Sequence, residues 1–123
     1  MEYPITNGVR QLPTNSSRLA VLDRVASELF PPLVMLEIGS LYGDSARVLA
    51  KYGELCCVDT WDWKDAEFIF RYNTEGLDIA RFRGKSVDIL PQFKDNAFDL
   101  IYIDGDHTYP NVEFDINEAK RLI

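Results

Sequence analysis

Residues 33–45, LVMLEIGSLYGDS, constrain the fold of this chain more than any other segment. An apolar run that contains Glu37 is followed by Gly39 and Gly43 and then by a helical pattern. This order predicts a buried strand, a glycine-containing turn and a helix, the arrangement in which open α/β sheets hold nucleotide-like ligands. Asp44 stands at the expected helix start, where a carboxylate repels the phosphate that a helix N-terminus attracts. The segment therefore predicts a ligand without a phosphate.

Length and composition place this segment in one modest domain. The chain has 123 residues, of which 46% are hydrophobic, which predicts a folded core. A net charge of −7 argues against a nucleic-acid or anionic membrane partner, and no apolar run reaches the roughly 18–20 residues of a membrane span. The adjacent Cys56 and Cys57 are typical of two small buried side chains in a reducing, cytoplasmic setting. We expect an N-terminal arm over residues 1–14 and one domain over residues 15–123.

The predicted elements are a first helix followed by alternating strands and helices. Predicted strands are residues 33–38, 55–59, 79–83 and 98–103, and predicted helices are residues 17–30, 44–52, 62–72, 87–93 and 110–123. The alternation predicts a three-layer α/β fold with a parallel, Rossmann-like sheet. Gly53 is expected to end the second helix. The last helix is expected to bury one face, made of Val112, Ile116, Ala119 and Ile123.

Polar residues follow three of the predicted strands, in the loops 40–45, 59–62 and 104–108. In a parallel sheet these loops meet beyond the carboxyl ends of the strands, where ligands bind. Asp59 lies 20 residues after Gly39, where an acid accepts hydrogen bonds from ribose hydroxyls or else caps a helix. Trp61 is either an adenine neighbour or a packing residue. Glu37 is expected to face a cationic ligand or backbone amides, or to make a structural hydrogen bond to the loop.

The sequence DGDH follows the most apolar predicted strand. Asp104 stands at the strand end, where catalytic and binding residues concentrate. His107 is the only histidine, and it is a candidate general base or an anchor for the last helix. Asp104 and Asp106 carry oxygen atoms suited to a divalent ion, although two carboxylates do not make a site.

Three segments resemble class I S-adenosylmethionine-dependent methyltransferases, and among them the small-molecule O-methyltransferase-like group called methyltransferase family 24. They are VMLEIGSLYGDSA at Val34–Ala46, CVDTWD at Cys57–Asp62 and FDLIYIDGDHTYPNVEFDI at Phe98–Ile116. The resemblance covers roughly residues 15–123. It implies an enzyme that transfers a methyl group from S-adenosylmethionine to the hydroxyl group of a small-molecule acceptor.

The resemblance also implies a role for each matching position. The implied cofactor-binding residues are Glu37, Gly39, Ser40, Gly43, Asp59, Thr60, Trp61, Ser86 and Asp104. Glu37 and the glycine turn would border the methionine part, Asp59 would bind the ribose, and Ser86 would lie near the adenine edge. Asp104 would sit near the methyl acceptor, with His107 as the second candidate catalytic residue.

The family's sheet usually continues, in the order 3-2-1-4-5-7-6. We expect this chain to form only the N-terminal half, with order 3-2-1-4, which would leave the strand FDLIYI as an exposed edge. Such an edge predicts pairing into a homo-oligomer. Related sugar and antibiotic methyltransferases bind magnesium after the fourth and fifth strands, so Asp104 is also a candidate magnesium ligand.

Two other hypotheses stand beside the methyltransferase. The first is a truncated, inactive module that binds the cofactor or associates with itself. The second is a nicotinamide-dependent oxidoreductase, but a dinucleotide fingerprint would need glycines where the chain has Leu41 and Asp44.

Overall fold

Four parallel strands form the centre of the structure, a computed structural model that describes residues 5–6, 9–10, 16–104 and 109–123. The strands are β3 (Leu33–Ile38), β4 (Gly53–Asp59), β5 (Ile79–Arg83) and β6 (Leu100–Ile103). The helices are α1 (Ser16–Glu28), α2 (Asp44–Leu49), α3 (Ala66–Asn73), α4 (Ser86–Ile89) and α5 (Tyr109–Leu122), with 3₁₀ turns η1 (Ala50–Tyr52) and η2 (Leu90–Gln92). The sheet order is β5-β4-β3-β6, which confirms the predicted order 3-2-1-4.

The strand register brings all four carboxyl ends to one edge of the sheet. Ile38 lies beside Val58 on one side and beside Ile103 on the other. Asp59 lies beside Arg83 at the end of the outer strand. The loops that follow the strands therefore leave from one edge, as expected of a parallel sheet.

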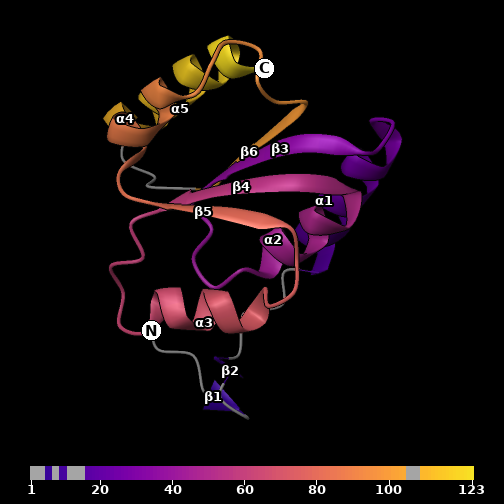
Figure 1. Ribbon diagram of the computed structural model, residues 1–123, viewed down its shortest axis with the longest axis vertical. Coiled ribbons are helices and arrows are strands. Elements are labelled where there is room, and N and C mark those ends of the chain that lie inside the picture. Colours follow the sequence, from indigo (N-terminus) through magenta and orange to yellow (C-terminus); the bar gives the residue numbers. More distant parts are fainter. Residues whose placement is uncertain (1–4, 7–8, 11–15, 105–108) are drawn as a thin grey trace.

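Helices cover both faces of the sheet, which makes three layers (Figure 1). Helices α1, α2 and α3 lie on one face, and α4 and α5 lie on the other. Successive side chains of β3 point alternately toward the two helical layers, because side chains alternate along a strand. Met35 is buried among the α1–α3 side chains, and Leu36 is buried against the α4–α5 layer. Each such burial stabilises the fold by about 1.5–3 kcal/mol.

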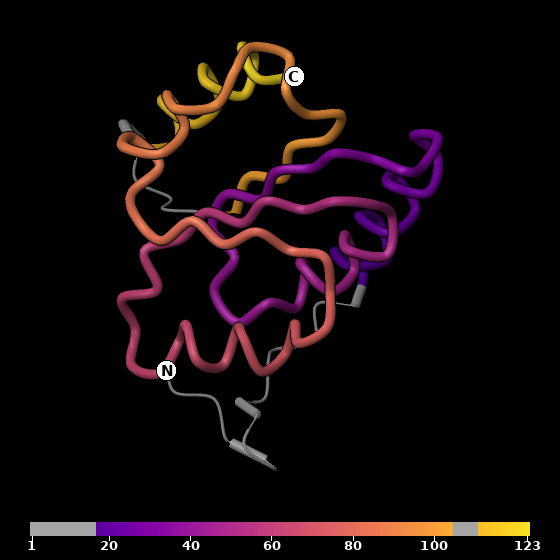
Figure 2. The backbone as a smooth tube through the Cα atoms, viewed as in Figure 1, coloured from indigo at the N-terminus to yellow at the C-terminus, as the bar shows by residue number. Residues whose placement is uncertain are grey.

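The path of the chain places its last strand beside its first long one. Figure 2 shows the chain running from β3 out to β5 and then back, so that β6 lies next to β3. Among the described strands, β5 and β6 are therefore the edges of the sheet. All four residues of β6 are half-buried, whereas Ala80–Arg83 of β5 are exposed.

Gly53 ends the 3₁₀ turn η1 that continues α2, as predicted, and it also begins β4. Its φ of 147° and ψ of −154° are not those of the left-handed residue that commonly follows a helix. A Cβ atom there would lie 2.0 Å from the carbonyl oxygen of Leu33, so the close approach of β3 and β4 requires glycine.

The buried face of α5 differs from the predicted one. Ile116 and Ile123 are exposed, whereas Asp115 and Leu122 are buried. Polar contacts account for this difference. Arg121 donates hydrogen bonds to the carbonyl oxygens of Leu90 and Phe93, and these bonds fix the rotation of the helix.

Short elements precede α1, where the sequence predicted an irregular arm. Strands β1 (Ile5–Thr6) and β2 (Val9–Arg10) pair antiparallel. None of the helices in the described ranges has the length and apolar character that crossing a membrane requires.

Candidate functional site

The loop after β3 is held close to the sheet by backbone hydrogen bonds. Gly39 donates to the carbonyl oxygen of Val58 at 2.8 Å, and Gly43 donates to that of Ser40 at 3.0 Å. Gly43 has φ 93°, and a Cβ atom there would lie 3.0 Å from Thr74 and 3.2 Å from Phe70. The second glycine therefore allows both a left-handed turn and close packing against α3.

Asp59 joins the loops that follow β3 and β4. Its Oδ2 accepts a hydrogen bond from the Leu41 N–H at 2.9 Å, and its Oδ1 accepts one from the Trp61 N–H at 2.7 Å. Leu41 and Trp61 both have positive φ, 45° and 48°, which is uncommon for residues with a side chain. Because a carboxylate offers about four acceptor positions, Asp59 can fix both loops and still accept ribose hydroxyls.

The Trp61 side chain completes this joint and favours the packing interpretation of that residue. Its indole N–H donates to the Leu41 carbonyl oxygen at 2.8 Å, and its ring lies 5.0 Å from that of Phe70. The side chain is buried, so its ring faces belong to the core. Thr60 and Ser86 lie half-buried at the carboxyl ends of β4 and β5, with Ser86 at the first position of α4.

Glu37 is fully buried in β3, directly below the glycine loop. Its Oε1 accepts a weak hydrogen bond from Cys57 Sγ at 3.9 Å, and its Oε2 has no hydrogen-bond partner of normal geometry among the described residues. Burial raises the pKa of Glu37 to about 7, the hydroxyl groups of Ser40 and Ser45 lower it, and the charges of Asp44 and Asp104 raise it further. Near neutral pH this carboxyl group can therefore gain or lose a proton.

The side chain of Arg18, a residue that was not predicted from the sequence, contacts three polar side chains. They are those of Asp44, Tyr102 and Asp104. Arg18 Nη2 lies 3.1 Å from Asp44 Oδ2, and Nη1 lies 2.8 Å from Asp104 Oδ2. Nη1 also donates to the Tyr102 hydroxyl group. These residues are 26 and more positions apart in sequence, so no local pattern pointed to them.

The carboxyl ends of β3, β4 and β6 thus gather Glu37, Asp59 and Asp104 with the glycine loop. His107 and Asp106 lie outside the described residues. Within the described ranges, no group of three or more potential metal ligands comes together. The Asp104 carboxylate is also paired with Arg18, so the donor set seen here does not fit the predicted magnesium ion.

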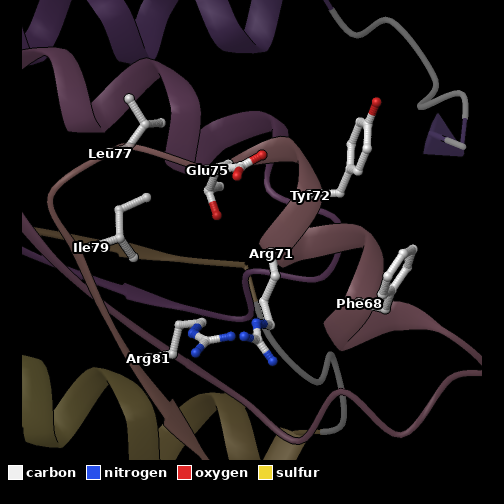
Figure 3. A pocket seen from close by; sticks show the side chains of 8 residues that line it. Phe68, Arg71, Tyr72, Glu75, Leu77, Ile79 and Arg81 are labelled. Carbon is white, nitrogen blue, oxygen red and sulfur yellow. The ribbon is translucent and has the colours of Figure 1, made fainter. Parts of the chain in front are cut away.

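A separate groove of about 490 Å³ lies between α3 and the start of β5 (Figure 3). Its lining residues are Phe68, Arg71, Tyr72, Thr74, Glu75, Leu77, Ile79 and Arg81. In Figure 3 the guanidinium groups of Arg71 and Arg81 point toward one another, while Phe68 and Tyr72 point away from them. None of the predicted site residues that the structure describes lines this groove, and the carboxylate of Glu75 shares it with the two cations.

A methyltransferase-domain family model matches residues 36–123. No curated protein matches the chain. Among solved structures, cofactor-bound Rv0187 from MTB is 24% identical with a TM-score of 0.75, over 93% of this chain and 54% of that one.

Two O-methyltransferases are similarly close in fold. One, from Bacillus cereus in complex with SAH, is 24% identical with a TM-score of 0.74, over 89% of this chain and 53% of that one. The other, TomG from Streptomyces achromogenes, is involved in tomaymycin synthesis and was solved with SAM; it is 21% identical with a TM-score of 0.72, over 90% of this chain and 52% of that one. These likenesses support the fold, and the chain spans about half the length of each structure.

Proposed function

Because this chain belongs to the methyltransferase-domain family, we propose that it is the cofactor-binding half of an S-adenosylmethionine-dependent enzyme that methylates the hydroxyl group of a small-molecule acceptor. We place it in the cytoplasm, with no nucleic-acid or membrane partner. The observation that carries the proposal is the meeting of Asp59, Glu37 and Asp44 around one glycine loop.

The residues at this loop fit each part of the cofactor. Asp59 can accept hydrogen bonds from ribose hydroxyls, and Ser86 lies at the carboxyl end of β5, on the adenine side of the proposed site. Glu37 and Ser40 supply a buried carboxyl oxygen and a buried hydroxyl group that lie near each other, but neither atom has a hydrogen-bond partner of normal geometry within the described part of the chain. Because buried polar atoms are normally satisfied, these two atoms favour a polar ligand above them.

The bound cofactor would supply a methyl group on a sulfonium cation. The contribution of this chain is to position that group and to surround it with negative charge. Glu37, whose pKa is about 7, would ionise when a cation binds nearby and would regain its proton when the cation leaves. Asp104 and His107 stay the predicted acceptors of the proton that the substrate hydroxyl group loses.

Calorimetry tests cofactor binding without mutating Asp59, whose structural role would confuse the result. We expect the wild-type protein to bind S-adenosylhomocysteine and to bind its 2′-deoxy analogue about tenfold or more less tightly. The reason is that a hydrogen bond to a charged group contributes about 1.5–3 kcal/mol. NAD⁺, which carries a pyrophosphate, is the control ligand and should release no heat. A folded sample that does not bind S-adenosylhomocysteine, or that binds NAD⁺ more tightly, contradicts the proposal.

The second candidate is a non-catalytic module that binds the cofactor or pairs with itself. The observation that favours it is the edge strand β6, which pairs only with β3 among the described strands. This candidate predicts cofactor binding without methyl transfer and a dimer in sedimentation velocity. Ile101→Lys adds a charge to this half-buried edge strand and should dissociate that dimer, with thermal unfolding to verify that the variant is folded. A monomer at high concentration that methylates an acceptor rules this candidate out.

A further inference from the structure

Arg18 links two carboxylates at the edge of the sheet where the methionine part of the proposed cofactor would lie. Asp44 begins α2, and Asp104 follows β6 and donates its N–H to the Ile38 carbonyl oxygen of β3 at 2.8 Å. One guanidinium group bonds both side chains, which brings the two carboxylates close to one another. We propose that Arg18 recognises the α-carboxylate of the cofactor's amino acid, an assignment that rests on the proposed function.

The charges around this edge require a cation for any zwitterionic ligand. Glu37, Asp44 and Asp104 are three acids, and in the described ranges Arg18 is the cation that forms ion pairs with Asp44 and Asp104. An amino acid carries an ammonium group, which the acids attract, and a carboxylate, which they repel. A guanidinium group offsets that repulsion and offers the carboxylate two N–H donors.

The ion pairs of Arg18 are suited to exchange with such a ligand. The exposed fraction of the side chain is 31% for Arg18, 23% for Asp44 and 37% for Asp104. Pairs this open to water contribute little to stability, so breaking one has a small cost. A ligand ammonium group can replace the guanidinium group at one carboxylate while the ligand carboxylate binds the guanidinium group, so the two ion pairs of the free protein become three.

The backbone that carries Arg18 is fixed, so the exchange needs only side-chain movement. Leu22 and Ala26 bury the same helix against α2 and the sheet. The Tyr102 ring also lies under the guanidinium group of Arg18. The distance from the ring centroid to Cζ of Arg18 is 5.9 Å. Helix and ring therefore hold the cation at the edge in the absence of ligand.

The test compares S-adenosylhomocysteine with its decarboxylated analogue, which keeps the adenosine, the thioether and the amine. In wild type we expect the carboxylate to improve the dissociation constant about tenfold or more. In Arg18→Gln the ratio of the two constants should fall to near one, and in Arg18→Lys it should be intermediate, because lysine keeps the charge but loses the planar fork. Thermal unfolding verifies that each variant is folded.

Arg121→Gln is the control, since Arg121 also bridges two carboxylates, Asp95 and Glu118, with a side chain that is 30% exposed, but on the α5 side. Because Arg121 also donates to the carbonyl oxygens of Leu90 and Phe93, thermal unfolding must show that this variant is folded. It should keep the wild-type ratio. An unchanged ratio in Arg18→Gln, or a wild-type ratio near one, overturns the assignment of Arg18 while leaving the cofactor proposal intact. Failure of wild type to bind either ligand contradicts the proposed function itself and, with it, this assignment.

Discussion

On the β3–β4 side of the candidate site, backbone groups hold the loops, whereas on the β6 side a single arginine side chain holds the acids. Asp59 accepts two backbone N–H groups, and Gly39 and Gly43 donate to carbonyl oxygens. Asp104 instead meets the half-exposed Arg18. A ligand part that must be held in one geometry suits the first side, and a part that enters by exchanging ion pairs suits the second.

The largest expected effect comes from removing the carboxylate of Asp59, which connects the loops after β3 and β4. Asp59→Ala leaves the N–H groups of Leu41 and Trp61 without their acceptor in two loops with positive φ. We expect a loss of about 4 kcal/mol in the free energy of unfolding, measured in urea, because each stranded donor costs about 1–3 kcal/mol. Asp62→Ala, an exposed acid three residues later, is the control and should change little. Equal losses in the two variants would mean that Asp59 does not join the loops.

The β3–β4 side was largely predictable from sequence, and the reason is local. The bounds of β3 and β5 match the predicted strands, because each is a short run bordered by turn residues. Glycines and an acid at fixed spacing then identified the loop and Asp59. The hydrogen bonds from Leu41 and Trp61 to Asp59 were not predictable, since they depend on how two loops pack in space.

The β6 side and α5 were less predictable because long-range polar contacts decide them. Arg18 meets Asp104 across 86 positions, and no spacing rule relates the two. In α5 the apolar residues alone favoured a face with Ile116 and Ile123, but the hydrogen bonds of Arg121 turn Asp115 and Leu122 inward. The roles of the site residues stay predictions.

Glu37 links the two sides, and its pH dependence can be measured. Its pKa is raised from 4.5 to about 7 in the fold, so between these values the folded state binds more protons than the unfolded state. Stability should therefore fall as the pH rises from about 4.5 to above 7, by roughly 3 kcal/mol in total. In Glu37→Gln this part of the fall should be absent when urea unfolding is followed from pH 4.5 to 8.5.

The same measurement has a matched control and a clear contrary result. Glu54→Gln removes an exposed carboxylate from the neighbouring strand β4 and should leave the slope at its wild-type value. A Glu37→Gln curve that parallels wild type would show that Glu37 ionises freely in the fold. With ligand, we expect the affinity for the cationic S-adenosylmethionine to rise with pH through about 7, since the ionised form of Glu37 attracts it.

The substitution Gly43→Ala tests how tightly the β3–β4 side is packed. The new Cβ atom would lie 3.0 Å from Thr74 and 3.2 Å from Phe70, at φ 93°. We expect a loss of about 2 kcal/mol in the free energy of unfolding, from the left-handed conformation and the contacts together. Gly76→Ala separates the two causes, because Gly76 has φ 81° and open space around it. A loss no larger than that of Gly76→Ala would show that α3 yields and that the loop is not tightly packed.

The smallest expected change in stability is at Arg18, and this completes the contrast with Asp59. Arg18→Gln removes two ion pairs, but both are open to water, so we expect a loss of about 1 kcal/mol or less. The loss should shrink further in 1 M salt, because screening weakens exposed pairs. Arg83→Gln breaks a single pair with Glu67 on a more exposed side chain and should have almost no effect. If Arg18→Gln instead destabilises as much as Asp59→Ala, the β6 side is a rigid structural joint. Its ion pairs would then be too stable to exchange with the carboxylate and ammonium groups of a ligand.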